Sequence, residues 1–146
     1  MLSRLLIFAG VLLLSQSAGA WSTPRDAIQN FLAFEVSGGR LKSWPFGKYL
    51  AVREGEYDEP GWDVVTLVEG YKIQRISCSA ASCIARVNFR FVPTKTLTFN
   101  DIYPHPDGGT EVVEYKIIQS NGEWLLEPNV AAPKVYLRTY QRLGWK

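Results

Sequence analysis

Two cysteines, Cys78 and Cys83, carry the most reactive side chains of this 146-residue chain, and four residues separate them. Such a pair can form a disulfide, act as reactive thiols or supply part of a metal site. Redox-active pairs usually have two intervening residues and a nearby helix N-terminus, and a metal would need more ligands than the single histidine, His105, adds. We therefore expect a structural disulfide and no metal site.

Residues 1–20 indicate the compartment in which these cysteines reside. Arg4 precedes a run of ten apolar residues, and small residues follow up to Ala20, which is the pattern of a secretory signal peptide. The apolar run is about half as long as a membrane-spanning helix requires. We expect cleavage near Ala20 and an exported chain, periplasmic or secreted, without a membrane anchor. Disulfides form and persist in such oxidising compartments.

The sequence around the cysteines predicts a β-hairpin. Residues 71–78 and 83–92 are rich in β-branched and aromatic side chains, and residues 79–82 form the loop between them. Cys78 and Cys83 then lie opposite each other, within disulfide range. This register assigns alternate side chains to opposite faces of the hairpin. The core face carries Ile76, Cys78, Cys83, Ala85, Val87, Phe89 and Phe91, and the polar face carries Tyr71, Ile73, Arg75, Arg86, Asn88 and Arg90.

Helical signals precede this hairpin, and strand signals surround it. Thr23 and Pro24 predict a helix start, apolar residues then recur at near-helical spacing, and Gly38-Gly39 predicts the end. In the last hairpin, Lys116 should face Glu127 as a cross-strand ion pair. The remaining predicted elements are a short helix or turn in 40–52, a polar acidic loop at 53–63, strands at 64–68, 95–103, 111–119 and 123–127, and a two-residue turn at Asn121-Gly122.

The order of these elements, and above all the closing hairpin EYKIIQSNGEWLLEP at 114–128, resembles the cystatin-like α+β proteins of the nuclear transport factor two superfamily. The resemblance implies an α+β fold in which one or more N-terminal helices pack on a strongly curved antiparallel sheet of four to six strands. We expect residues 21–146 to form a single domain of this kind, with a short helix or a tail from about residue 133. Polyketide cyclases, ketosteroid isomerases and many non-enzymatic modules share this fold, so the fold does not fix the activity.

Two sets of side chains are candidates for binding. Arg75 faces Arg86 on the outer face of the sheet, beside Arg90, and this is unfavourable unless an anion or an acid such as Glu114 offsets it. These arginines could hold an anionic ligand or an acidic partner, or they could be solvated or lie in a dimer interface. Aromatic side chains would line any pocket inside the cone, although large apolar residues more often fill a core. They are Phe31, Phe89, Phe91, Tyr115 and Trp124.

Charge and the placement of acids narrow the function classes. Without residues 1–20 the chain keeps 15 of its 16 basic residues against 14 acidic ones, a balance that does not indicate nucleic-acid binding. We expect no catalytic residue, because no acid lies on the predicted inner strand face. We also expect no cofactor. The preferred function is a non-catalytic exported module that binds a small apolar ligand or a protein partner, with a homodimer through the sheet face as a further option. The alternative is a small isomerase- or cyclase-like enzyme that uses a carboxylate in the cone pocket.

Overall fold

The computed structural model describes residues 21–42, 46–52, 63–128 and 131–144. The predicted signal peptide at 1–20 and most of the predicted acidic loop, residues 53–62, lie outside these ranges. In chain order the elements are α1 (Pro24–Val36), α2 (Gly39–Lys42), the 3-10 helix η1 (Phe46–Tyr49), β1 (Thr66–Ser79), β2 (Ser82–Phe91), β3 (Gly109–Ser120), β4 (Glu123–Leu126), β5 (Lys134–Tyr136) and α3 (Leu137–Leu143).

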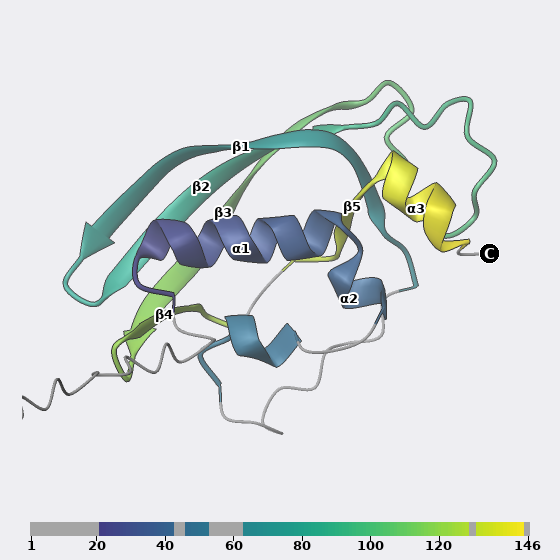
Figure 1. Cartoon of the computed structure of the whole chain (residues 1–146). Coiled ribbons are helices and arrows are strands. Elements are labelled where there is room, and N and C mark those ends of the chain that lie inside the picture. Colours follow the sequence, from purple (N-terminus) through teal and green to yellow (C-terminus); the bar gives the residue numbers. More distant parts are fainter. Residues whose placement is uncertain (1–20, 43–45, 53–62, 129–130, 145–146) are drawn as a thin grey trace, which may run out of the picture.

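The described strands form one five-stranded sheet in the order β4-β3-β2-β1-β5. Figure 1 shows the sheet curling over α1, which lies on its concave side, while α3 stands outside the bent end of β1. This arrangement confirms the predicted α+β cone. One detail of the prediction is wrong: the sheet is mixed, because β5 pairs in parallel with the start of β1, at Thr66–Val68.

Helix α1 begins and ends where the sequence predicts. The Thr23 side chain accepts a hydrogen bond from the Asp26 backbone N–H, and Pro24 occupies the first helical position. Beyond the helix, Gly38 has a φ of +77°, a conformation that favours glycine. The buried face of α1 points at the sheet and carries Ala27, Ile28, Phe31, Leu32, Glu35 and Val36.

The hairpin of β1 and β2 is joined by the predicted disulfide. Cys78 and Cys83 are directly opposed in the ladder, with Cα atoms 4.0 Å apart, and their sulfurs are bonded. The loop is tighter than predicted, because Ser79 also pairs with Ser82 and only Ala80 and Ala81 form the turn. A disulfide of this kind indicates an oxidising environment.

The predicted faces of β1 are correct near the disulfide and wrong further along. Arg75 faces Arg86 as expected, but the register shifts between Ile73 and Arg75. The shift is a β-bulge, in which one extra residue reverses the side-chain alternation that follows. Tyr71 and Ile73 therefore lie over the core rather than on the polar face, opposite Phe89 and Val87 respectively.

The segment predicted as a strand at 95–103 is mostly loop. It turns at Thr94, whose carbonyl accepts from the Leu97 N–H, and a single bridge joins Ile102 to Val65. Of the two conformations predicted for the C-terminal segment, the structure has the helix, α3.

Two apolar clusters hold these layers together. The larger lies on the concave side, between α1 and the sheet, and includes Phe31, Phe89 and Tyr115. The smaller lies around α3 at the bent end of β1 and includes Leu67, Val135 and Tyr140. Among the described helices, none has the length and apolar character needed to cross a bilayer.

Candidate functional site

The concave side of the sheet encloses an acid that the sequence analysis did not single out. Glu35 lies in the last turn of α1, and only 1% of it is exposed. Ala27, Phe31 and Glu35 follow one another at spacings of four, so all three lie on the buried face of the helix. An acid in an otherwise apolar helical stripe was the available sequence signal. The expectation of no catalytic residue considered only acids on the inner face of the strands.

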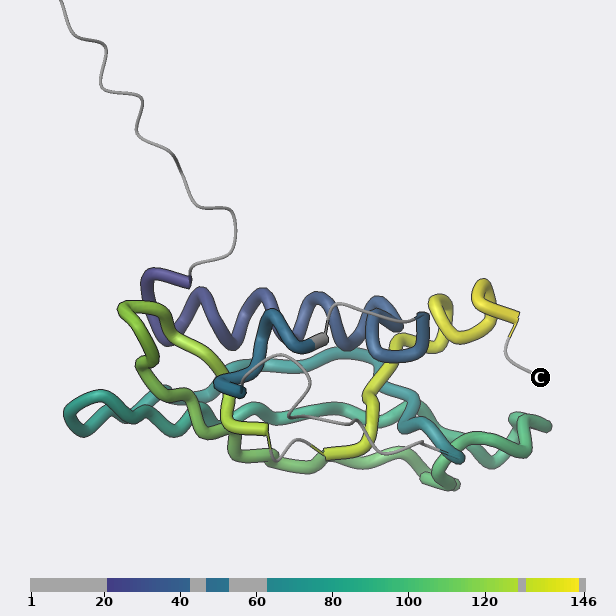
Figure 2. The backbone as a smooth tube through the Cα atoms, turned by 90° about the horizontal axis from the view of Figure 1, so that it is seen from below, coloured from purple at the N-terminus to yellow at the C-terminus, as the bar shows by residue number. Residues whose placement is uncertain are grey.

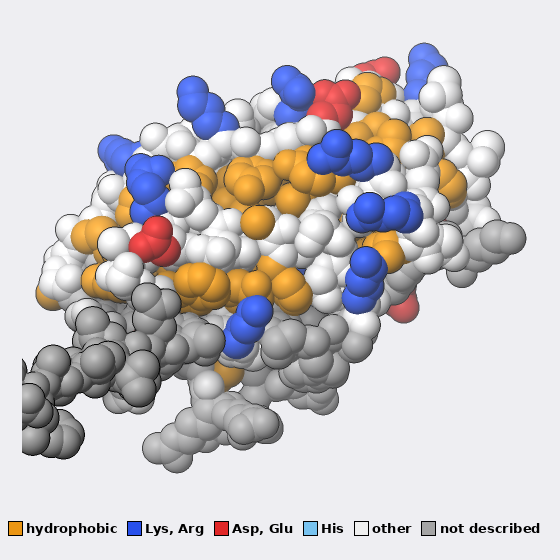
Figure 3. Space-filling view, in the orientation of Figure 1, with side chains coloured by type: hydrophobic (Ala, Val, Ile, Leu, Met, Phe, Trp, Pro, Cys, Tyr) orange, Lys and Arg blue, Asp and Glu red, His pale blue; other side chains and the backbone are white. Residues whose placement is uncertain are grey.

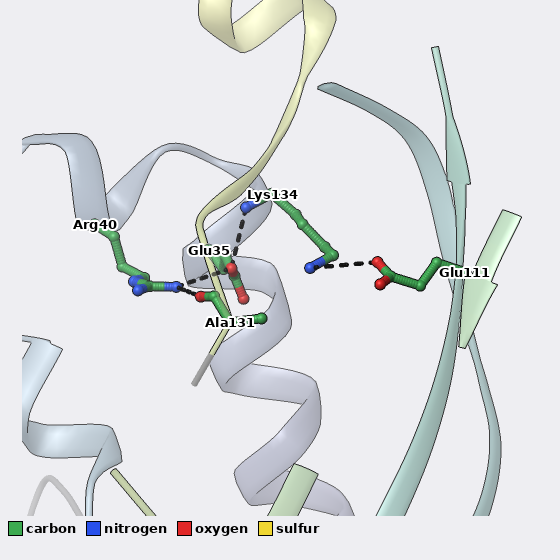
Figure 4. A network of polar contacts seen from close by, with 5 residues as sticks. All are labelled: Glu35, Arg40, Glu111, Ala131 and Lys134. Atoms are coloured by element: carbon green, nitrogen blue, oxygen red, sulfur yellow. Dashed lines mark hydrogen bonds and ion pairs between the residues drawn. The ribbon is translucent and has the colours of Figure 1, made fainter. Parts of the chain in front are cut away.

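The side chain of Arg40 and the backbone of Lys134 both contact the Glu35 carboxylate (Figure 4). The guanidinium Nη1 of Arg40 donates to Glu35 Oε1 at 3.1 Å, and both side chains are 1% exposed. The backbone N–H of Lys134 donates to the same oxygen, also at 3.1 Å. Arg40 Nη1 donates further to the carbonyl of Ala131 at 2.8 Å. Glu35 and Arg40 thereby join α1 and α2 to the segment that leads into β5.

The side chain of Lys134 extends this network toward β3. Its ammonium lies 3.9 Å from a carboxylate oxygen of Glu111, which is half-exposed, and 5.1 Å from the centre of the Phe89 ring. Lys134 itself is 3% exposed. Its methylene chain is therefore buried, while its charge reaches the carboxylate at the sheet surface.

Burial dominates the ionisation of these groups. It raises the pKa of the Glu35 carboxyl, against the opposing effects of Arg40 and Lys134. It also lowers the pKa of the Lys134 ammonium, which the Glu35 and Glu111 carboxylates partly offset. The pKa of the Tyr115 hydroxyl lies well above its ordinary value, first through burial and then through the Glu35 charge. The interior thus disfavours every uncompensated charge.

The buried polar atoms without a hydrogen-bond partner among the described residues include the second carboxylate oxygen of Glu35, Oε2, and the hydroxyl of Tyr115. Both are buried on the concave side, and the Glu35 charge contributes to the raised pKa of the Tyr115 hydroxyl. A carboxylate with a raised pKa is chemically able to exchange a proton with a bound molecule. Access is the limiting condition, because Glu35 is almost wholly enclosed.

The aromatic residues predicted as pocket lining belong to the packed interior. Phe31 and Phe89 have no exposed surface, Tyr115 and Phe91 have little, and Trp124 is half-buried. Phe31 packs against Tyr115 with ring centroids 5.7 Å apart. None of the five lines the hollow beside α3 that includes Val68 and Tyr136, or the one that includes Phe99 and Tyr140. Four of the five belong to the concave cluster, and Trp124 packs against it.

On the outer face of the sheet, two of the three predicted arginines already have acidic partners. Arg86 lies 3.5 Å from Glu114 on the neighbouring strand, and Arg90 lies 2.6 Å from Glu69. All four side chains are substantially exposed. Glu114 is the acid that the sequence analysis named as a counter-charge for the facing arginines. Arg75 is exposed and makes no ion pair with a described residue.

The other chemical groups considered from the sequence are placed as follows. His105 stacks on Phe91 with ring centroids 3.8 Å apart, and burial lowers the pKa of its imidazole. Lys116 and Glu127 form the predicted cross-strand ion pair, at 2.8 Å. The described residues contain no group of three histidine, cysteine or acidic side chains arranged to hold a metal ion.

Comparisons with known proteins add little to this geometry. No family model matches the sequence, and no curated protein is significantly similar to it. A solved structure from Campylobacter jejuni, described as a "Putative NTF2-like transpeptidase", is similar with a TM-score of 0.45 and 16% identity, over 73% of this chain and 98% of that one. We assign neither activity nor family on that likeness. The described elements themselves form a curled α+β sheet with α1 on its concave side.

Proposed function

We propose that this chain is an exported, non-catalytic module that binds a protein partner through the outer surface of its sheet. The observation that carries the proposal is the enclosure of Glu35. This carboxylate is 1% exposed and accepts from Arg40 and from the Lys134 backbone, so it stabilises the fold and is withheld from a substrate. The burial of the predicted lining residues Phe31, Phe89, Phe91 and Tyr115 likewise supports a filled cone rather than a cavity for a small apolar ligand.

The outer surface offers the exposed chemistry that a partner can use. Arg75, Arg86 and Glu114 form a row across β1, β2 and β3, and Arg90 lies further along β2. Exposed ion pairs of this kind contribute little to stability, roughly 0–1 kcal/mol each. They can instead exchange partners when an acidic surface approaches, which favours encounter and fixes orientation. The predicted signal peptide and the disulfide support a periplasmic or secreted location for this encounter.

Co-purification from the exported fraction tests the proposal. The tagged wild-type chain should retain a partner, identified by mass spectrometry, and the Arg86→Ala/Arg90→Ala double variant should retain at least about tenfold less. A matched control, Arg25→Ala/Lys42→Ala, removes the same charge from exposed positions on α1 and α2 and should retain the wild-type amount. Equal retention by all three proteins would contradict a role for the outer face. Recovery of a second copy of this chain would instead show that the chain binds itself as a homodimer.

One observation favours the alternative, a small isomerase- or cyclase-like enzyme. Glu35 has a raised pKa and a carboxylate oxygen without a hydrogen-bond partner among the described residues, as a buried general base would. The Glu35→Gln variant distinguishes the two functions, because it keeps a hydrogen-bond acceptor and removes the base. Turnover of an added carbonyl compound by the wild-type chain, lost in a folded Glu35→Gln variant, would replace the binding function with the enzymatic one.

A further inference from the structure

Strand β1 has one side that is mostly unpaired within the described structure. Its Thr66–Val68 segment pairs with β5, and from there to Ser79 only β2 pairs with it. Alternate backbone N–H and C=O groups along a free strand edge point away from the sheet and can bond to another extended chain. The free edge of β1, defined here as residues 70–79, is therefore a template for an additional strand.

The space beside this edge suits a strand that covers apolar surface. Figure 2 shows α1 running alongside β1 on the side away from β2, and Figure 3 shows a band of apolar side chains between the two elements. On the core side of β1, Tyr71, Ile73 and Ile76 pack against the concave cluster but remain partly exposed. An added strand would place alternate side chains beside these three residues, on the face that α1 covers.

The opposite face of the same edge is basic. Lys72 and Arg75 are exposed, and neither forms an ion pair with any residue in the described ranges. The acid on this part of β1, Glu69, is already bonded to Arg90 at 2.6 Å. Two copies of the chain paired edge to edge would bring these unpaired cations together, which is unfavourable. Lysine and a bulge, here at Gln74, also prevent indiscriminate pairing of an edge.

We propose that the free edge of β1 accepts an extended segment of a partner protein, with alternating acidic and apolar side chains, as a sixth strand. The acidic side chains meet Lys72 and Arg75, and the apolar ones meet Tyr71, Ile73 and Ile76. This inference rests on the proposed binding function and names the partner segment that the function requires.

A synthetic peptide tests the inference without knowledge of the partner. The probe is a capped, fluorescently labelled octapeptide of alternating glutamate and valine, added to the disulfide-bonded chain. It should bind and should slow hydrogen exchange at alternate amides of residues 70–79, because those N–H groups gain acceptors. A lysine-valine peptide should bind at least about tenfold more weakly, and the charge-reversed variant Lys72→Glu/Arg75→Glu should invert this preference.

Two controls separate strand pairing from charge attraction. A glutamate-valine peptide with alternate N-methyl groups keeps its charge and loses backbone donors, so it should not bind. Arg25→Glu/Lys42→Glu has the same charge change away from the edge and should bind the unmethylated peptide like wild type. Equal binding of both peptide forms, or unchanged exchange in 70–79, overturns the inference. Such results would leave the proposed function intact if capture of the co-purified partner still depended on Arg86 and Arg90. The proposed function itself fails if that capture is independent of both arginines.

Discussion

The concave and outer sides of the sheet use the same kinds of charged side chains in different ways. On the concave side, Glu35 pairs with Arg40, and the side chains of both residues are 1% exposed. On the outer side, Arg86 pairs with Glu114 and Arg90 pairs with Glu69. These four side chains are 42–66% exposed. Removing one partner from a buried pair leaves an uncompensated charge in the interior, whereas water solvates the remaining partner of an exposed pair. Burial therefore decides which charges hold the fold and which remain available for binding.

Removal of the Glu35 carboxylate should have the largest effect. Glu35→Ala leaves the Arg40 guanidinium without this bond and the Lys134 N–H without its acceptor, which should lower the free energy of unfolding by about 3–5 kcal/mol. Urea unfolding of the disulfide-bonded proteins measures the loss. Glu35→Gln is the matched control, because its amide oxygen can still accept both bonds, and it should cost less. An alanine variant as stable as wild type would show that the Glu35 carboxylate does not stabilise the fold.

Loss of the disulfide should have an intermediate effect. Cys78→Ser/Cys83→Ser opens a loop with a sequence separation of 5, so the chain-entropy model gives about 2 kcal/mol in the free energy of unfolding. Reduction of the wild-type protein should give the same change in urea unfolding. The ladder beyond the turn, from Ile76 paired with Ala85 onward, should keep its register. A loss of native amide shifts throughout β1 and β2 would show that the disulfide determines the register itself.

A pH dependence should follow from the ionisation of Glu35. Its pKa is raised in the folded state, so the folded protein holds this proton at pH values where the unfolded chain has released it. The Glu35 contribution to stability is therefore greatest below the ordinary pKa of a glutamate, 4.5, and falls as pH rises through the folded pKa. Urea unfolding of wild type and Glu35→Gln across this range isolates the contribution. The stability difference, wild type minus variant, should decrease with rising pH, and an increase would contradict the assignment.

The smallest effect should come from an exposed pair. Lys116→Ala removes the partner of Glu127, whose side chain is 41% exposed, and should change the free energy of unfolding by less than about 1 kcal/mol. In 1 M salt the difference from wild type should nearly vanish, because salt screens surface charges. Urea unfolding with and without salt gives both values. A loss of unfolding free energy as large as that of Glu35→Ala would contradict the difference between buried pairs on the concave side and exposed pairs on the outer side.

Local signals in the sequence were sufficient for much of the outer side. The pairing of Cys78 with Cys83 placed Arg75 opposite Arg86, and the Asn121-Gly122 turn placed Lys116 opposite Glu127. Each of these predictions needed only two adjacent strands and a short turn, so the period-two alternation was sufficient.

The concave side required long-range information. Glu35 is buried because the segment around Ala131 and Lys134, about 100 residues away in the chain, packs against the end of α1. The bulge at Gln74 places Tyr71 and Ile73 on the core face, and no residue type in this part of the sequence predicts a bulge there. Strand β5 is three residues long and pairs in parallel, so its own sequence carries too weak a pattern to predict it.

Hydrogen exchange of the chain with and without its co-purified partner tests most directly whether binding uses the outside of the sheet. Our account predicts slower exchange in β1 and β2, including residues 70–79 at the free edge, and unchanged exchange in the middle of α1. Slower exchange confined to α1 and the segment around Glu35, with β1 and β2 unchanged, would contradict it and would indicate that the concave side is the binding site.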